Sequence, residues 1–158
     1  MDRFPAIVVT VTPNMASFAT PYSSGDVIGS VTKIPNALLD MGYCAKLLSV
    51  VVLDAANQKS ALDFVFFTQT PANSIGADNS PYALNDADLL KVCGRFSVLT
   101  ADYVSSGTNN AEATKTNIKL LLEGVPGSRD LYMAVISRGT PTYGSASDLS
   151  IKLGLEQE

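Results

Sequence analysis

Short runs of apolar residues, separated by turn-forming residues, are the main pattern along the chain. Residues 6–12 are rich in β-branched residues, alternate between two faces and end before Pro13. Residues 149–156 show the clearest alternation, with leucine or isoleucine at every second position. Both patterns predict β-strands that bury one face.

Other segments of the same character predict further strands at 26–32, 45–53, 62–68, 94–104, 115–123 and 131–137. Residues 45–53 are nearly all apolar, which at this length indicates a strand covered on both faces. Helix is scarce. One or two turns are predicted at 36–41, ending at Gly42, and a short helix at 85–92 that stops at Gly94.

This order of elements indicates the fold class. Parallel sheets need a helix-length crossover between strands, and such crossovers are missing. We therefore expect an all-β fold, an antiparallel sandwich of about eight strands that is jelly-roll-like and has one or two short helices. Neither a repeat nor a linker divides the chain, so residues 1–158 are expected to form a single β-sandwich domain.

The amino-acid composition excludes several classes of protein. Of the 158 residues, 46% are hydrophobic and 16% charged, the net charge is −4, and there is no histidine or tryptophan. Disorder is excluded, and without a basic tract we expect no nucleic acid partner. The apolar stretches, such as 47–53, are too short to span a membrane, and residues 1–5 lack the features of a signal peptide. We expect a soluble chain, made in a reducing compartment, with no membrane partner.

Cys44 and Cys93 both follow apolar or aromatic neighbours. Free cysteine is among the most buried residue types, so two buried free thiols are expected, with one bridge between them as the alternative. Two thiols without histidine or a C-x-x-C motif do not favour a metal site.

Oxygen donors are densest at Asp78, Asn79, Asn85, Asp86 and Asp88. A hard cation such as Ca²⁺ takes such ligands, but the spacing of a calcium-binding loop is missing. Helix capping explains the last three residues without any ion. We expect no metal and no cofactor.

No catalytic residue is assigned. The S-x-x-K pattern at Ser30–Lys33 lies in a predicted strand, without the elements that complete such a site, and a Ser-His-Asp triad is impossible without histidine. A carboxylate pair would meet only in the fold. Acidic residues at predicted strand ends are expected to serve turns and edges; they are Asp26, Asp54, Asp63, Asp130 and Asp148. The tyrosines are expected mainly as rim and interface residues; they are Tyr22, Tyr43, Tyr82, Tyr103, Tyr132 and Tyr143.

Several segments together resemble a known group of proteins. They are Gly25-Asp26-Val27-Ile28-Gly29, Val50-Val51-Val52-Leu53-Asp54, Leu62-Asp63-Phe64-Val65-Phe66-Phe67, Pro71, Ala77-Asp78-Asn79, Ala83-Leu84-Asn85-Asp86-Ala87-Asp88, Leu131-Tyr132-Met133-Ala134-Val135, Arg138-Gly139-Thr140-Pro141-Thr142-Tyr143 and Ser147-Asp148-Leu149. Over residues 19–156 the chain resembles small virion structural proteins of tailed bacteriophages, in particular head-decoration (cement) proteins, some of which have a jelly-roll fold.

The resemblance implies a binding role on the outer capsid surface of the virion, after assembly in the host cytoplasm. The implied partner is the phage major capsid protein, whose neighbouring subunits the chain would bridge, and the chain itself would form a dimer or trimer. Strand edges and chain ends are expected to add strands to neighbours, first at residues 1–5 and 155–158.

Two other functions remain open at this stage. One is a glycan- or host-receptor-binding jelly-roll module of a phage head fibre or tail, although the lack of tryptophan is unfavourable to a sugar-stacking surface. The other is a small hydrolase that uses two carboxylates, for which the local motifs are missing. We therefore expect a structural protein and no enzyme.

Overall fold

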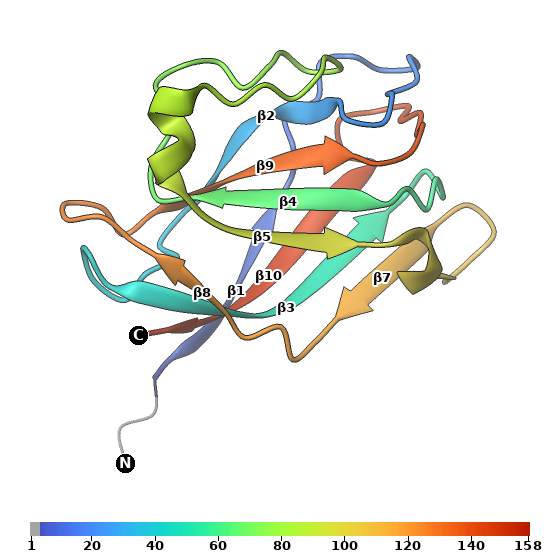
Figure 1. Ribbon diagram of the computed structural model, residues 1–158. Coiled ribbons are helices and arrows are strands. Elements are labelled where there is room, and N and C mark those ends of the chain that lie inside the picture. The colour runs from blue at the N-terminus through green and yellow to red at the C-terminus, as the bar shows by residue number, and fades with distance from the viewer. Residues whose placement is uncertain (1–3) are drawn as a thin grey trace.

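A computed structural model describes residues 4–158 and shows two antiparallel sheets packed face to face (Figure 1). The first sheet contains β1 (Ala6–Val11), β10 (Leu149–Gln157), β3 (Cys44–Asp54), β7 (Ala111–Lys115) and β6 (Tyr103–Ser105), and β8 (Leu120–Glu123) also pairs with β3. The second sheet contains β2 (Val27–Ile34), β9 (Leu131–Ser137), β4 (Leu62–Phe67) and β5 (Val92–Val98), in that order.

The strand pairs are nested along the chain. β4 pairs with β5, β3 with β7, β2 with β9, and β1 with β10, so each pair encloses the previous one. When such nested antiparallel pairs fold over into two facing sheets, the strand orders are β1-β10-β3-β7 in one sheet and β2-β9-β4-β5 in the other, as observed here. The fold is a jelly roll. The predicted all-β antiparallel sandwich is therefore confirmed.

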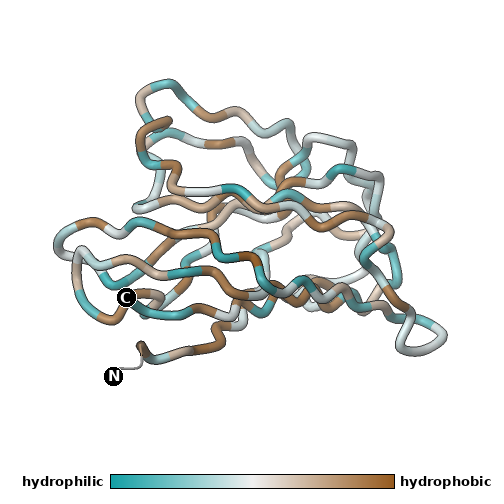
Figure 2. Tube along the Cα trace, turned by 60° about the horizontal axis from the view of Figure 1, so that its bottom comes forward, coloured by the Kyte–Doolittle hydropathy of each residue, from teal (hydrophilic) through white to brown (hydrophobic). Residues whose placement is uncertain are grey.

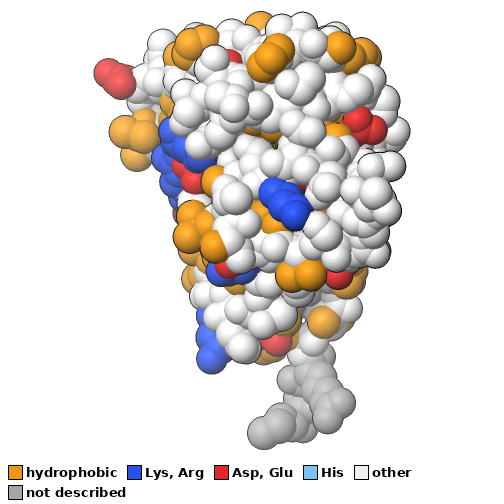
Figure 3. Space-filling view, turned by 90° about the vertical axis from the view of Figure 1, so that its right-hand side faces the viewer, with side chains coloured by type: hydrophobic (Ala, Val, Ile, Leu, Met, Phe, Trp, Pro, Cys, Tyr) orange, Lys and Arg blue, Asp and Glu red, His pale blue; other side chains and the backbone are white. Residues whose placement is uncertain are grey.

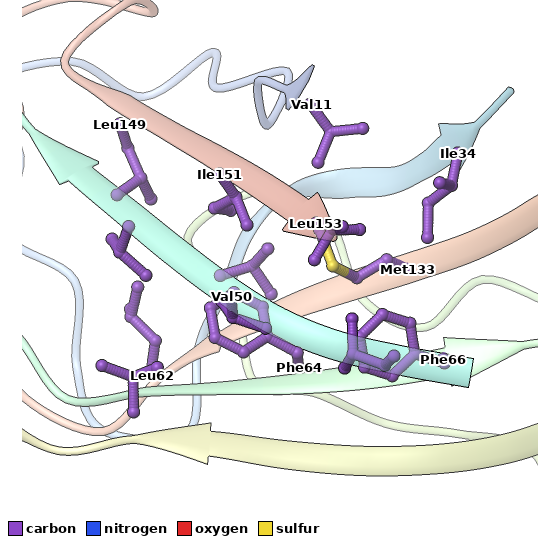
Figure 4. Close-up of a cluster of buried hydrophobic side chains, with 14 of the residues drawn as sticks. Val11, Ile34, Val50, Leu62, Phe64, Phe66, Met133, Leu149, Ile151 and Leu153 are labelled. Carbon is purple, nitrogen blue, oxygen red and sulfur yellow. The ribbon is translucent and has the colours of Figure 1, made fainter. Parts of the chain in front are cut away.

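The core lies between the two sheets and follows from the alternation of the strands (Figures 2 and 4). Ile151 and Leu153 of β10 point toward Phe64 and Phe66 of β4, and all four side chains are fully buried. Because successive strand residues point to opposite faces, the residues between them on β10 are polar or half-exposed, whereas Val65 of β4 is buried on the outer face of its sheet. One buried face per strand is enough to hold the layers together.

A second apolar cluster covers the outer face of the second sheet. The connection from Thr68 to Lys91, which contains the 3₁₀ helix η1 (Asp86–Lys91), lies over it. The fully or nearly buried members of this cluster are Val27, Val65, Phe67, Ile75, Ala134 and Ile136. No such layer of described residues lies over the first sheet, and Val51 and Leu53 of β3 are half-exposed there. The prediction that 45–53 is covered on both faces is therefore wrong.

Residues 4–158 form ten strands rather than eight, and two of the predicted runs are interrupted. Residues 94–104 divide into β5, the 3₁₀ helix η2 (Thr100–Asp102) and β6. Residues 115–123 contain the last residue of β7, Lys115, and then no strand until Leu120, since Asn117 and Lys119 adopt left-handed backbone conformations with φ of 58° and 57°. The alternating apolar pattern of the sequence continues across this turn, so the turn could not be predicted from that pattern.

Of the two predicted helices, one exists. Asn85 caps η1, its side chain accepting a hydrogen bond from the Ala87 N–H (2.9 Å). The helix ends at Lys91, so the predicted stop at Gly94 is wrong, and that glycine lies in β5. The predicted helix at 36–41 is also wrong: Leu38 is fully buried and its N–H donates to the carbonyl of Arg129 (3.0 Å), so tertiary contacts replace helical ones.

Candidate binding surfaces

Asp78 joins the two long connections beside β2. Its carboxylate accepts hydrogen bonds from the N–H groups of Ala16 (2.8 Å), Ser17 (2.7 Å) and Gly29 (2.6 Å) and from the Tyr22 hydroxyl (2.8 Å). Burial raises the pKa of Asp78, but these hydrogen bonds outweigh it and hold the pKa below its usual value. All four of these hydrogen bonds come from groups of the fold itself.

Asp88 plays a similar role on the other side of the same connection. It is buried, forms an ion pair with Lys91 (2.7 Å), and accepts hydrogen bonds from the N–H groups of Ala72 (2.8 Å) and Asn73 (2.9 Å). Lys91 and these amides hold the pKa of Asp88 well below its usual range. Asp88 therefore holds the loop at Ala72 and Asn73 against η1 and does not cap the helix. The residue that caps η1 is Asn85.

The residues predicted as oxygen donors thus bind different segments of the chain and do not converge on one site; Asp78, Asp88 and Asn85 each have their own partners. In residues 4–158, no group of three or more histidine, cysteine, aspartate or glutamate side chains could hold a metal ion. Asp86 is exposed in the first turn of η1, where a negative charge suits the helix terminus.

Acid is expected to destabilise the fold, because Asp63, Asp78 and Asp88 have lowered pKa values in the folded chain. Aspartates in the unfolded chain titrate near about pH 3.9. As the pH falls, the unfolded state binds protons first and the free energy of unfolding decreases. Urea unfolding should therefore give a lower midpoint at about pH 3 than at about pH 7. Equal midpoints would contradict this expectation.

The S-x-x-K pattern has no catalytic geometry. Ser30 is exposed on β2, and Lys33 forms an ion pair with Asp130 (2.6 Å). The register of β2 against β9 shifts between Ile28 and Thr32, so Ser30 lies in an irregular stretch of the strand, while Lys33 is engaged by Asp130. The pattern is a coincidence of sequence.

A hollow of about 270 Å³ is lined by both Asp54 and Glu112. Glu112 is opposite Leu53 in the β3–β7 register and shares its outer face, whereas Asp54 is buried on the inner face. Burial raises the pKa of Asp54, whose carboxylate accepts hydrogen bonds from the N–H groups of Ala56 (3.0 Å) and Lys59 (2.7 Å). The two carboxylates therefore do not converge on one site.

Sequence reasoning missed a charged cluster on the second sheet. Asp63 accepts hydrogen bonds from Arg95 (2.7 Å), Arg138 (2.6 Å) and Ser97 (2.6 Å). Burial raises the pKa of Asp63, but Ser97 and the two arginines outweigh it and lower the pKa. These residues come from three strands or strand ends, so only the pairing of β4 with β5 and β9 brings them together.

Both cysteines are free thiols, and three of the six tyrosines are buried in the core. Cys44 and Cys93 are free, as predicted, but half-buried rather than buried. Burial raises the pKa of Cys93 to about 11, so this thiol stays protonated at neutral pH. The prediction of rim positions is wrong for three tyrosines, since Tyr22, Tyr103 and Tyr143 are buried. All three belong to the main core, where the rings of Tyr22 and Tyr143 meet edge to face with their centroids 6.0 Å apart.

Five of the eleven large exposed apolar side chains in the described residues lie at one end of the sandwich. The β2–β3 connection presents three of them and η1 two; we call these the apolar loop end, and they are Leu39, Met41, Tyr43, Leu89 and Leu90. Both segments lie at the end where β4 finishes and β9 begins (Figure 1). The opposite end, seen in Figure 3, is mostly backbone and side chains that are neither hydrophobic nor charged, with scattered hydrophobic and charged side chains among them. The most exposed of the large hydrophobic residues described, Leu90, is thus on η1 and not on a strand.

No protein-family model and no curated protein matches the chain. Among solved structures, that of tomato aspermy virus has a TM-score of 0.38 at 12% identity and covers 98% of this chain and 78% of its own. Desmodium yellow mottle tymovirus gives 0.29 at 13% identity, covering 98% and 81%.

A full particle of Israeli acute paralysis virus gives a TM-score of 0.28 at 10% identity, covering 96% of this chain and 70% of that one. All three TM-scores are low, and the assignment of the fold rests on the strand order instead. In the part of the chain that the structure describes, no helix has both the length and the apolar character needed to cross a membrane.

Proposed function

We propose that the chain is a structural component of a virus particle that binds the outer surface of a tailed-phage head and stabilises contacts between major capsid subunits. In this proposal the protein acts by binding alone. Jelly rolls occur in viral capsid domains and also in lectins and cupins, so the fold is compatible with this role but does not determine it. The argument for capsid binding therefore depends on the surface.

The apolar loop end is the observation that supports the proposal. Leu90 is 94% exposed and Leu89 is 59% exposed. A leucine this open contributes little to the stability of its own chain, and clustered exposed apolar groups mark interaction sites. Buried Asp88 fixes the helix that carries both leucines. A rigid apolar anchor loses little conformational entropy when it enters a pocket of a partner.

Charge supports a protein partner rather than the packaged genome. The chain has 11 basic and 15 acidic residues and a net charge of −4. Binding to nucleic acid draws most of its affinity from lysine and arginine contacts with phosphates. On a particle, each contact is repeated by symmetry, so modest affinity per contact is sufficient when one oligomer touches several subunits.

The proposal is tested on purified particles of the virus that encodes the chain. Quantitative mass spectrometry should find a copy number comparable with that of the major capsid protein, and particles lacking the chain should release DNA at a lower temperature. Absence from the particle would overturn the proposal. A copy number of only a few, together with saturable binding in a glycan screen, would instead favour a receptor-binding module.

A single substitution tests the apolar loop end. Leu90→Ser should weaken binding of the purified chain to particles that lack it by about tenfold, because it removes a central apolar anchor. Leu99→Ser is the matched control: Leu99 is 58% exposed, but it lies at the opposite end, beside η2. Binding should be measured by co-sedimentation. Equal loss in both variants would exclude the apolar loop end as the contact.

A further inference from the structure

β1 is an edge strand whose outer side has no partner. It pairs with β10 on one side, from Ala6 opposite Glu156 to Val11 opposite Ile151. Within residues 4–158, no other backbone or side-chain hydrogen bond reaches Ala6–Val11. Natural proteins protect such edges with charges, prolines, bulges or covering loops. β1 contains only alanine, isoleucine, valine and threonine, and its pairing has no bulge.

The direction of its backbone groups follows from one bond at the start of the strand. The Gln157 N–H donates to the Pro5 carbonyl (2.9 Å), which makes these two residues a hydrogen-bonded pair. Hydrogen-bonded and non-bonded pairs alternate along an antiparallel ladder. The N–H and C=O groups of Ala6, Val8 and Thr10 therefore point away from β10, toward the open edge.

The other strand edges are shorter, partly covered or charged. The start of β2 is covered, since the Val27 N–H donates to the Ser80 carbonyl (2.9 Å) and the Asn79 N–H donates to the Val27 carbonyl (2.9 Å). β5 has β8 beside it and exposes Arg95. β6 is only three residues long. Among the described strands, β1 offers the longest uncharged edge.

From this edge we infer that two copies of the chain form a two-fold dimer in which β1 pairs antiparallel with β1 of the second copy. Val8 is opposite Val8 of the other copy, and Ala6 is opposite Thr10. In this register all three outward N–H groups and all three outward C=O groups of each β1 are paired, giving six hydrogen bonds between the copies. A shift by two residues would leave some of these groups without a partner in the strand.

The side chains fit the same register. Ile7 and Val9 pack against the core but are only partly buried, because no strand follows β1 at this edge. In the dimer each Ile7 is opposite Val9 of the second copy, which extends the apolar layer across the two-fold axis. On the outer face, the two Val8 side chains, each 69% exposed in one copy, lie side by side. The contact is isologous, as a two-fold dimer requires.

Opposite charges at one position test the pairing. The full chain should show a concentration-dependent mass of twice 16.6 kDa in sedimentation equilibrium. Val8→Glu and Val8→Lys should each remain monomeric, because each places two like charges directly opposite one another. An equimolar mixture of the two variants should restore the dimer, since opposite charges then meet. Circular dichroism should show that each variant alone keeps the strand content of the parent.

Thr10→Glu is the matched control, because Thr10 is opposite Ala6 in the proposed register and beside Lys152 in its own chain. This variant should dimerise within about threefold of the parent. A parent chain that is monomeric at all concentrations would overturn the inference, and so would a dimer that survives both Val8 substitutions or a mixture that fails to recover. The inference is independent of capsid binding, which is measured on particles with Leu90→Ser.

Discussion

Replacing Phe64 by alanine is expected to lower the free energy of unfolding by about 4 kcal/mol, because the ring fills the space between the two sheets. Phe64 is fully buried on β4, opposite Phe96 on one side and Val135 on the other. The strands around it are paired on both sides and cannot close easily on the cavity. For a chain of this size the melting temperature should fall by about 12 °C, as measured by calorimetry.

Phe4→Ala is the control for this change. Phe4 is 54% exposed, and the same atoms are removed without leaving a cavity. The free energy of unfolding should change by no more than about 0.5 kcal/mol. Similar losses in the two variants would show that the packing between the sheets is not the main source of stability.

Asp78→Ala is expected to cost about 3 kcal/mol, because one carboxylate accepts hydrogen bonds from four groups. Its removal leaves the N–H groups of Ala16, Ser17 and Gly29 without their acceptor, and half-buried donors are costly to leave unpaired. The connection between β1 and β2 should become mobile while the sheets persist. Hydrogen exchange should show faster exchange of these amides, and urea unfolding should give the loss of stability.

Asp86→Ala removes the same charge from the same connection and is the matched control. The Asp86 side chain is exposed and accepts no hydrogen bond from residues 4–158, so the expected change is within about 0.5 kcal/mol. Asp78→Asn, which keeps the size but loses the charge, should lie between the two. If Asp78→Ala were as stable as Asp86→Ala, the carboxylate would not be what holds the connection.

The strands were predictable because each buries one face and so leaves a period of two in the sequence. Residues 131–137 are a strand over their full predicted length. Prediction from alternation fails where the backbone turns without a change in the hydropathy pattern, as at Asn117 and Lys119. It also fails where local helix signals compete with tertiary bonds, as at Leu38.

Surface features were less predictable, because they depend on which segments meet. The sequence indicates a capped helix at 85–92, but not that Asp88 points inward and leaves Leu90 in solvent. The open edge of β1 could not be predicted from the sequence either, because it follows from the pairing of β1 with β10, a strand at the other end of the chain. The cap at Asn85 was predictable because it is local.

The nested pairing has a consequence for biosynthesis. Strand β1 leaves the ribosome long before β10, the only described strand with which it pairs. Contacts between segments so distant in sequence form slowly, and the hairpin of β4 and β5 is the first pair that can close. Until β10 emerges, β1 is an apolar segment with both edges unsatisfied, and such segments recruit other nascent chains. Chaperone capture during translation should therefore centre on the first strand.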